Sequence, residues 1–240
     1  MILRQYYRAR LREKRTWILL GILALYLLYL FVIQGHSFVW DLSEEDQVLL
    51  FHNDYMGKKA ITFLVVPLYL VYCLYSLTFF LKTPVHYRFR SHLAFCRWWY
   101  TALGLDALLY TLVLHVFLAL RFLIAGKFDL FLWKGAELAL SGVLEFFALF
   151  MMAALFCLLT FCFKHTVPAF VIVYGILVFD YVQSILFTSQ AQVYIFLENL
   201  IAYPYFYPAI VPRTLSMLGC LAALFVFLYL AADRLDTLKG

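Results

Sequence analysis

The sequence predicts an all-α integral membrane protein with six transmembrane helices. Of its 240 residues, 66% are hydrophobic and 14% are charged, whereas soluble domains average roughly 45–50% apolar and 25% charged residues. The hydrophobic residues gather in runs close to the roughly 20 residues that a helix needs to cross the hydrocarbon core. Backbone groups in lipid must bond within the segment, which favours helices. We expect one membrane domain over residues 1–240.

Six apolar segments are bracketed by charged residues, prolines and glycines. They cover residues 17–33, 60–81, 98–120, 136–163, 167–187 and 215–232. The fourth segment is about 28 residues long, which exceeds the bilayer core unless the helix tilts or protrudes. The basic, then apolar N-terminus lacks a convincing cleavage site after Gln34, so the first segment is expected to remain as a span.

The distribution of basic residues predicts the orientation. With the N-terminus inside, thirteen of the 19 Lys and Arg residues fall on the cytoplasmic side and six on the outer side. The positive-inside rule therefore places both termini in the cytoplasm. The sequence has no Asn-x-Ser/Thr sequon, which agrees with a multi-pass protein of a bacterial plasma membrane.

Residues 1–16 carry the pattern of an amphipathic helix. Leu3, Tyr7 and Leu11 recur every four residues, and beside them runs a basic stripe of Arg4, Arg8, Arg12 and Arg15. This pattern is typical of a helix that lies in the plane of the headgroups. The alternative is that the positive charge only fixes the orientation.

A second amphipathic segment covers residues 83–97, between the second and third spans. Its apolar positions have spacings of 4, 4 and 3, and they are Val85, Phe89, Leu93 and Cys96. Basic residues and histidines surround this stripe, so a short cytoplasmic helix is expected. Such a helix could fit a groove on a cytosolic partner. An ordinary positively charged loop is the alternative.

The connection before the last span is unusual. Residues 189–213 are mixed polar at first and then apolar and aromatic, with prolines at 204, 208 and 212. This stretch is too apolar for water and too interrupted to cross the membrane. We expect a re-entrant hairpin in the outer leaflet, with an aromatic belt as the alternative.

Together these features resemble the ABC-2 type transporter permeases over nearly the whole chain. The resemblance is one of architecture: an N-terminal in-plane helix, six spans, a cytoplasmic helix after the second span and a re-entrant hairpin before the sixth. It implies that residues 83–97 couple the chain to an ATPase. The expected coupling residues are Val85, Phe89, Arg90, Leu93 and Arg97.

The resemblance also implies partners and a cargo. Such permeases work as dimers with a second copy or paralogue, docked on ABC ATPase subunits, and small ones serve export of, or immunity against, amphipathic peptides. This chain has no GxxxxGK[ST] loop, so ATP and magnesium are expected on the partner, and neither a catalytic site nor a cofactor or metal site is expected here. The alternative is a non-enzymatic immunity or accessory protein that binds a peptide or partner spans. The net positive charge is explained by the orientation of the chain in the membrane, so no nucleic-acid partner is expected.

Ionisable residues inside the spans are candidates for function. A charge at membrane depth costs about 2.5–3.5 kcal/mol on insertion scales, so it faces the bundle interior. The candidates for a cargo path or for contacts between protomers are Asp106, Glu145, Asp180 and Gln183. Alternatively, these side chains pair with neighbours to hold the helices together. Asp106 and His115 are about half a helical revolution apart and cannot both face one site.

Several enzyme classes are disfavoured. The motifs of intramembrane aspartyl proteases are absent around Asp106 and Asp180, and HExxH is absent from the chain. The histidines are scattered, with only His115 deep in a span, which argues against a haem site. The five cysteines lie in or beside apolar runs and form no CxxC motif, so neither a disulfide framework nor a redox centre is expected.

Overall fold

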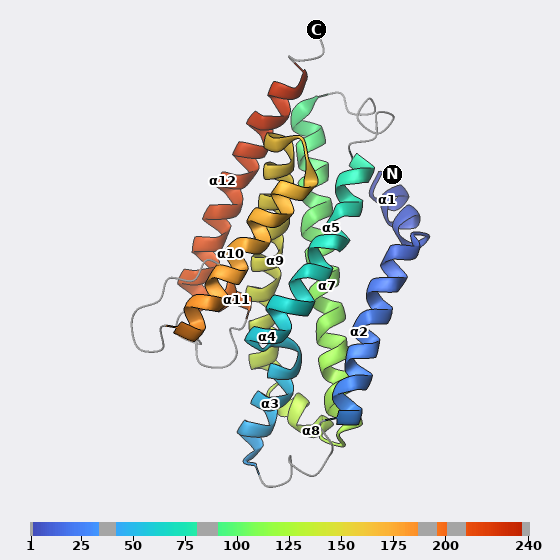
Figure 1. Ribbon diagram of the computed structural model, residues 1–240, viewed down its shortest axis with the longest axis vertical. Coiled ribbons are helices and arrows are strands. Elements are labelled where there is room, and N and C mark those ends of the chain that lie inside the picture. The colour runs from blue at the N-terminus through green and yellow to red at the C-terminus, as the bar shows by residue number, and fades with distance from the viewer. Residues whose placement is uncertain (1, 34–41, 81–90, 187–195, 201–209, 237–240) are drawn as a thin grey trace.

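A bundle of helices makes up the part of the chain that the computed structural model describes, residues 2–33, 42–80, 91–186, 196–200 and 210–236. Long helices run side by side, and α1 (Ile2–Leu11) lies at the same end as the C-terminal part of α12 (Figure 1). The other long helices are α2 (Lys14–Ile33), α5 (Val66–Phe80), α7 (His92–Ile124), α9 (Gly135–Phe163), α10 (Thr166–Leu186) and α12 (Ile210–Asp236). The all-α class is confirmed over the described ranges.

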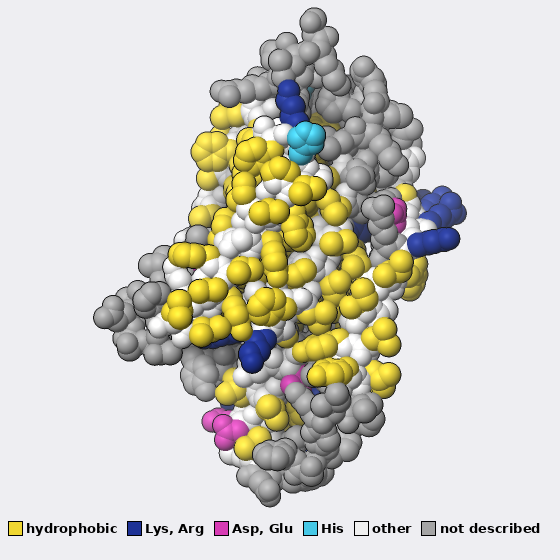
Figure 2. Space-filling model, viewed as in Figure 1, with side chains coloured by type: hydrophobic (Ala, Val, Ile, Leu, Met, Phe, Trp, Pro, Cys, Tyr) yellow, Lys and Arg dark blue, Asp and Glu magenta, His cyan; other side chains and the backbone are white. Residues whose placement is uncertain are grey.

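Five helices among the described residues are long and apolar enough to cross a membrane. They are Glu44–Leu74, His92–Ile124, Gly135–Phe163, Thr166–Leu186 and Ile210–Ala231. In α2 the described apolar stretch is shorter, Thr16–Tyr26. Hydrophobic side chains cover most of the described surface in Figure 2, with only a few charged side chains among them. Because such a surface is stable only against lipid, the protein is a multi-pass membrane protein.

The helix boundaries follow the predicted segments most closely in α9 and α10. Each of these two helices begins one residue before its predicted segment. The third span is longer than predicted, because α7 begins at His92 and ends at Ile124. Its 33 residues reach about 50 Å at 1.5 Å per residue, against about 30 Å of hydrocarbon. A straight α7 therefore extends well beyond the bilayer core.

The sequence analysis predicts no helix between residues 33 and 60, but the structure contains one there. Residues Glu44–Met56 form helix α3, which begins at the N-cap Ser43. The Ser43 hydroxyl accepts a hydrogen bond from the backbone amide of Asp46, and three acidic residues occupy the first turn. These acids interact favourably with the helix dipole. The same residues that suggest a polar loop by composition thus stabilise the start of a helix.

The long helical path from α3 to α5 bends at Gly57 and then passes through a π-helical turn. Gly57 has extended backbone angles between α3 and α4 (Lys58–Ala60), and a Cβ atom at Gly57 would lie 2.3 Å from the Asn53 carbonyl oxygen. The π-helix η2 (Ile61–Val65) follows and leads into α5. Pro67, in the first turn of α5, has no amide hydrogen to donate, which favours an irregular turn at this point.

Helix α9 lies at the centre of the bundle and packs against α7, α10, α12 and the short helix α11 (Leu197–Leu200). It is apolar over most of its surface, as a central helix must be, but Ser141, Glu145 and Thr160 are buried polar residues on it. A second, smaller apolar cluster forms beyond the main core, where α3 and α8 (Phe128–Trp133) meet the ends of α7 and α9. We call this region the α3/α8 end. Its buried residues include Val48, Phe51, Leu118, Phe122, Leu130 and Leu138.

Candidate functional site: buried polar clusters

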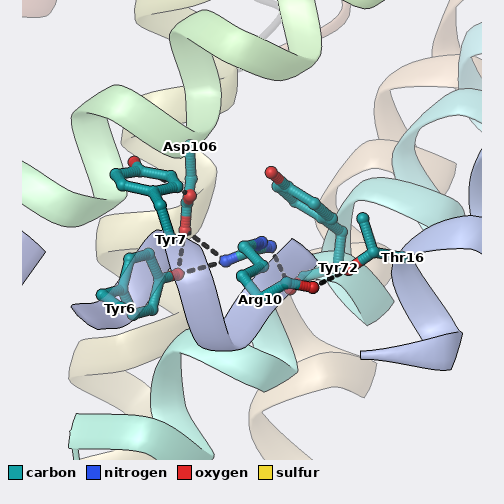
Figure 3. A network of polar contacts seen from close by, with 6 residues as sticks. All are labelled: Tyr6, Tyr7, Arg10, Thr16, Tyr72 and Asp106. Carbon is teal, nitrogen blue, oxygen red and sulfur yellow. Dashed lines mark hydrogen bonds and ion pairs between the residues drawn. The ribbon is translucent and has the colours of Figure 1, made fainter. Parts of the chain in front are cut away.

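The first cluster joins the N-terminal helix to the middle of the bundle. Arg10 of α1 forms an ion pair with Asp106 of α7, with 2.7 Å between Nη1 and Oδ2. The hydroxyls of Tyr6 and Tyr7 also donate to this carboxylate. The Arg10 guanidinium donates to the Tyr72 carbonyl oxygen at 2.8 Å and lies 3.4 Å from the centroid of the Tyr72 ring. Figure 3 shows these side chains converging from α1, α5 and α7.

Burial makes this cluster electrostatically significant. The side chain of Arg10 is 3% exposed and that of Asp106 is 0% exposed. Burial alone would lower the pKa of Arg10, but the Asp106 carboxylate together with Tyr6, Tyr72 and Cys73 has the larger effect, so the pKa is raised. Burial, followed by the charge of Asp106, raises the pKa of Tyr7. Arg10 therefore stays charged and acts as the counter-ion that Asp106 requires.

The buried face of α1 differs from the predicted one. Tyr6 and Arg10 are buried, whereas Leu11, expected on the apolar stripe, is 61% exposed. Leu3 lies among the residues whose side chains are not described. An unpaired carboxylate on α7 costs more free energy than an exposed leucine, so Asp106 selects the face of α1 that carries Arg10.

The second cluster lies at the α3/α8 end of the bundle. Both carboxyl oxygens of Glu145 on α9 face an imidazole: Oε1 is 4.0 Å from Nε2 of His52 and Oε2 is 3.8 Å from Nδ1 of His115. The neighbouring pair of Asp54 and Arg121 joins α3 to α7 at 3.0 Å, and both side chains are nearly fully buried. Three helices thus bring five ionisable groups into one buried region.

Asp180 has a different environment. Its Oδ2 atom accepts hydrogen bonds from the backbone amides of Phe196 and Leu197, at 2.8 and 3.2 Å. These amides lie at the start of α11, so the carboxylate of α10 anchors the short helix that precedes α12. Gln183 is half-buried one turn further along α10. The structure therefore separates Asp106, Glu145 and Asp180 into three surroundings.

The predicted coupling helix is only partly described. Leu93 and Arg97 are exposed, and they lie in the first two turns of α7, which begins at the N-cap Ser91. Residues 92–97 are thus continuous with the third span and do not belong to a separate short helix. Val85, Phe89 and Arg90 lie outside the described residues. Of the predicted re-entrant segment 189–213, the structure describes 196–200, which includes α11, and 210–213, which belong to α12.

The sequence analysis missed four members of these clusters, Arg10, His52, Asp54 and Arg121. The capping pattern of Ser43 and Asp46 could have revealed α3, and with it the buried positions Val48, Phe51 and His52 on one helical face. Nothing in the local pattern distinguishes Arg10 from the other arginines near the N-terminus. Its role depends on Asp106, about a hundred positions away in the chain.

The geometry defines the protein only as a helical multi-pass membrane protein with buried ion pairs. Among the described residues, no group of three or more His, Cys, Asp or Glu side chains is arranged to hold a metal ion. Comparison with known proteins gives no match to a family model, to a curated protein or to a solved structure. Function must therefore be inferred from the chain itself.

Proposed function

We propose that this protein is the membrane-spanning permease subunit of an ATP-driven transporter of the ABC-2 type, which exports or clears an amphipathic peptide or a lipid-like cargo. In this proposal the chain has six spans, with α2 as the first, and both termini are cytoplasmic. A dimer of such chains, or a pair of paralogues, binds separate ATPase subunits. The observation that carries the proposal is the arrangement of α1 and the start of α7 at one end of the bundle.

Helix α7 supports the proposal because it can transmit movement. It runs without interruption from the expected coupling segment to the α3/α8 end. A displacement of its first turns by a cytosolic motor would move Asp106, and through the ion pair it would move α1 as well. Rigid helices that move as units are a common means of coupling in transporters.

The short helix α11 provides further support. It precedes α12 at the position where the resemblance implies a re-entrant hairpin, and Phe196, Leu197 and Leu200 are buried. Asp180 fixes its first turn to α10. Irregular backbone at membrane depth is tolerated where protein groups satisfy it, as the Asp180 carboxylate does here.

Purification in a mild detergent tests the proposal directly. We expect the tagged chain to bring down a polypeptide with a complete nucleotide-binding loop, identified by mass spectrometry. Purified chain without such a subunit, and with full biological activity alone, would contradict the proposal and favour the non-enzymatic accessory protein.

A charge reversal at the start of α7 tests the coupling surface. We expect Arg97→Glu to reduce binding of the ATPase subunit at least tenfold, because Arg97 is exposed on the expected contact face. Lys59→Glu is the matched control, since Lys59 is exposed on α4 and assigned to the opposite side of the membrane. Equal binding by wild type and Arg97→Glu would remove Arg97 from the coupling surface.

A further inference from the structure

Glu145 is a buried acid whose charge needs an explanation. Its side chain is 1% exposed, and neither carboxyl oxygen has a hydrogen-bond partner among the described residues. A carboxylate in such a position is strongly unfavourable unless a positive charge or a bound proton compensates it. The nearest candidates are the rings of His115 and His52 on either side.

The hydrogen bonds of His115 indicate where the positive charge resides. Its Nδ1 atom lies 3.0 Å from the carbonyl oxygen of Thr111, and its Nε2 atom lies 3.2 Å from that of Leu138. A carbonyl oxygen can only accept a hydrogen bond, and a neutral imidazole has a single N–H group. Both bonds can therefore form together only when His115 carries a second proton as an imidazolium.

The packing holds the His115 ring in this position. A Cβ atom at residue 142 would lie 2.9 Å from Cε1 and Nε2 of the ring, so Gly142 leaves the space that the imidazole fills against α9. The ring thereby reaches the Leu138 carbonyl and stays 3.8 Å from Glu145. With both nitrogens bonded to carbonyls, His115 has no lone pair free for a metal ion, and the ligand that fits is a proton.

The other charged groups nearby pair with one another, so they do not neutralise Glu145. On α3 and α7, Asp54 and Arg121 neutralise each other at 3.0 Å. On α9, Glu137 pairs with Lys134 toward the surface. The side chain of His115 is 18% exposed, compared with 2% for His52, so His115 is the less buried of the two imidazoles.

We propose that His115, Glu145 and His52 form a proton-binding site, in which His115 holds the proton as an imidazolium and Glu145 is its counter-ion. His52 places a second imidazole against the other carboxyl oxygen of Glu145. The bound proton ties α7 to α9 beside α3, at the α3/α8 end. The site belongs to this chain alone and does not depend on the proposed ATPase partner.

Nitrogen-15 NMR of histidine rings tests the proposal on the full-length protein in lipid nanodiscs at about pH 8, where a histidine with the ordinary pKa of about 6.5 is almost entirely neutral. A ring with two protonated nitrogens gives signals distinct from those of both neutral tautomers. Among the 6 histidines, we expect one such ring in the wild type and its loss in His115→Gln. Absence of this ring in the wild type, or its persistence in His115→Gln, would overturn the proposal.

Three further variants test the positioning. Glu145→Gln removes the counter-ion, and Gly142→Ala displaces the ring, so each should reduce the doubly protonated population several-fold. Glu137→Gln is the matched control on the same helix, and it should leave the signal unchanged because Glu137 pairs with Lys134. An undiminished signal in Glu145→Gln would show that Glu145 is not the counter-ion and would overturn the site as proposed. These spectra require no ATPase subunit. Their outcome is therefore independent of the purification experiment that tests the proposed function.

Discussion

At the scale of single residues, buried charges determine which surfaces meet. Asp106 is completely buried on α7, and its carboxylate is neutralised by Arg10, which comes from a helix outside the spans. Asp54 and Arg121 form a second buried ion pair at the α3/α8 end of the bundle. Breaking such a pair leaves an uncompensated buried charge, whereas replacing both partners with apolar groups is often nearly neutral.

This asymmetry predicts the result of a double-mutant cycle. Arg10→Met should lower the free energy of unfolding by about 3 kcal/mol, because Asp106 then remains buried without its counter-ion. Adding Asp106→Leu should recover most of that loss. Unfolding in detergent micelles, followed by circular dichroism, measures both. Arg8→Met is the control, since Arg8 is exposed on the same helix; additive losses in the double variant would mean that the ion pair contributes no coupling energy.

Asp180 gives a more local prediction. Asp180→Asn retains the shape of the side chain but weakens the two hydrogen bonds to the amides of Phe196 and Leu197. Bonds to a charged acceptor are roughly twice as strong as neutral ones. We therefore expect these two amides to exchange with deuterium at least several-fold faster, with little change at the centre of α9. Unchanged exchange at both amides would show that the carboxylate does not anchor α11.

At the scale of elements, the second span shows how local backbone geometry shapes the bundle. The path from Glu44 to Phe80 is helical, but Gly57 interrupts it with extended backbone angles. At η2 the hydroxyl of Tyr110 donates to the Val65 carbonyl at 2.8 Å, which provides a partner at an irregular turn. The bend at Gly57 lies between η2 and α3, and α3 packs against the ends of α7 and α9 in the second apolar cluster.

Substitution of Gly57 tests this bend. Gly57→Ala brings a methyl group within 2.3 Å of a backbone oxygen, so the backbone must move, at a cost of about 1–3 kcal/mol. Gly175→Ala is the matched control, because a Cβ atom there meets no other atom within 4 Å and alanine favours the helix. The melting temperature should be lowest for Gly57→Ala, intermediate for the wild type and highest for Gly175→Ala. A Gly57→Ala protein as stable as wild type would show that the bend is easily deformed.

At the scale of the whole molecule, orientation in the membrane can be tested with the native cysteines. Cys162 is exposed near the end of α9, whereas Cys73, Cys96 and Cys157 are buried. Cys220 is exposed within the apolar span of α12, where lipid would cover it. Cys162 therefore provides a natural marker for the end of the bundle that carries α1.

We expect a membrane-impermeant maleimide to label Cys162 in inverted vesicles but not in intact cells, because the distribution of basic residues predicts that this end is cytoplasmic. The Cys162→Ser variant should lose the label. Mass spectrometry of the labelled peptide identifies the site. Labelling from outside intact cells would reverse the predicted orientation.

The helical membrane class and the approximate course of the spans follow from the order of the amino acids alone. Hydrophobic length and flanking charge are local properties, so α9 and α10 could be placed to within one residue at each end. The same local information separated Asp106 from His115, since their relative directions follow from helical geometry alone.

Which polar groups meet depends on how the helices pack in the folded protein. The sequence analysis predicted no helix between residues 33 and 60 and gave Arg10 no role, yet α3 is a helix and Arg10 is buried. The cost of an isolated buried charge falls sharply when a partner approaches, and that partner can come from any part of the chain. Pairing of this kind depends on three-dimensional proximity, which no periodicity along the sequence records.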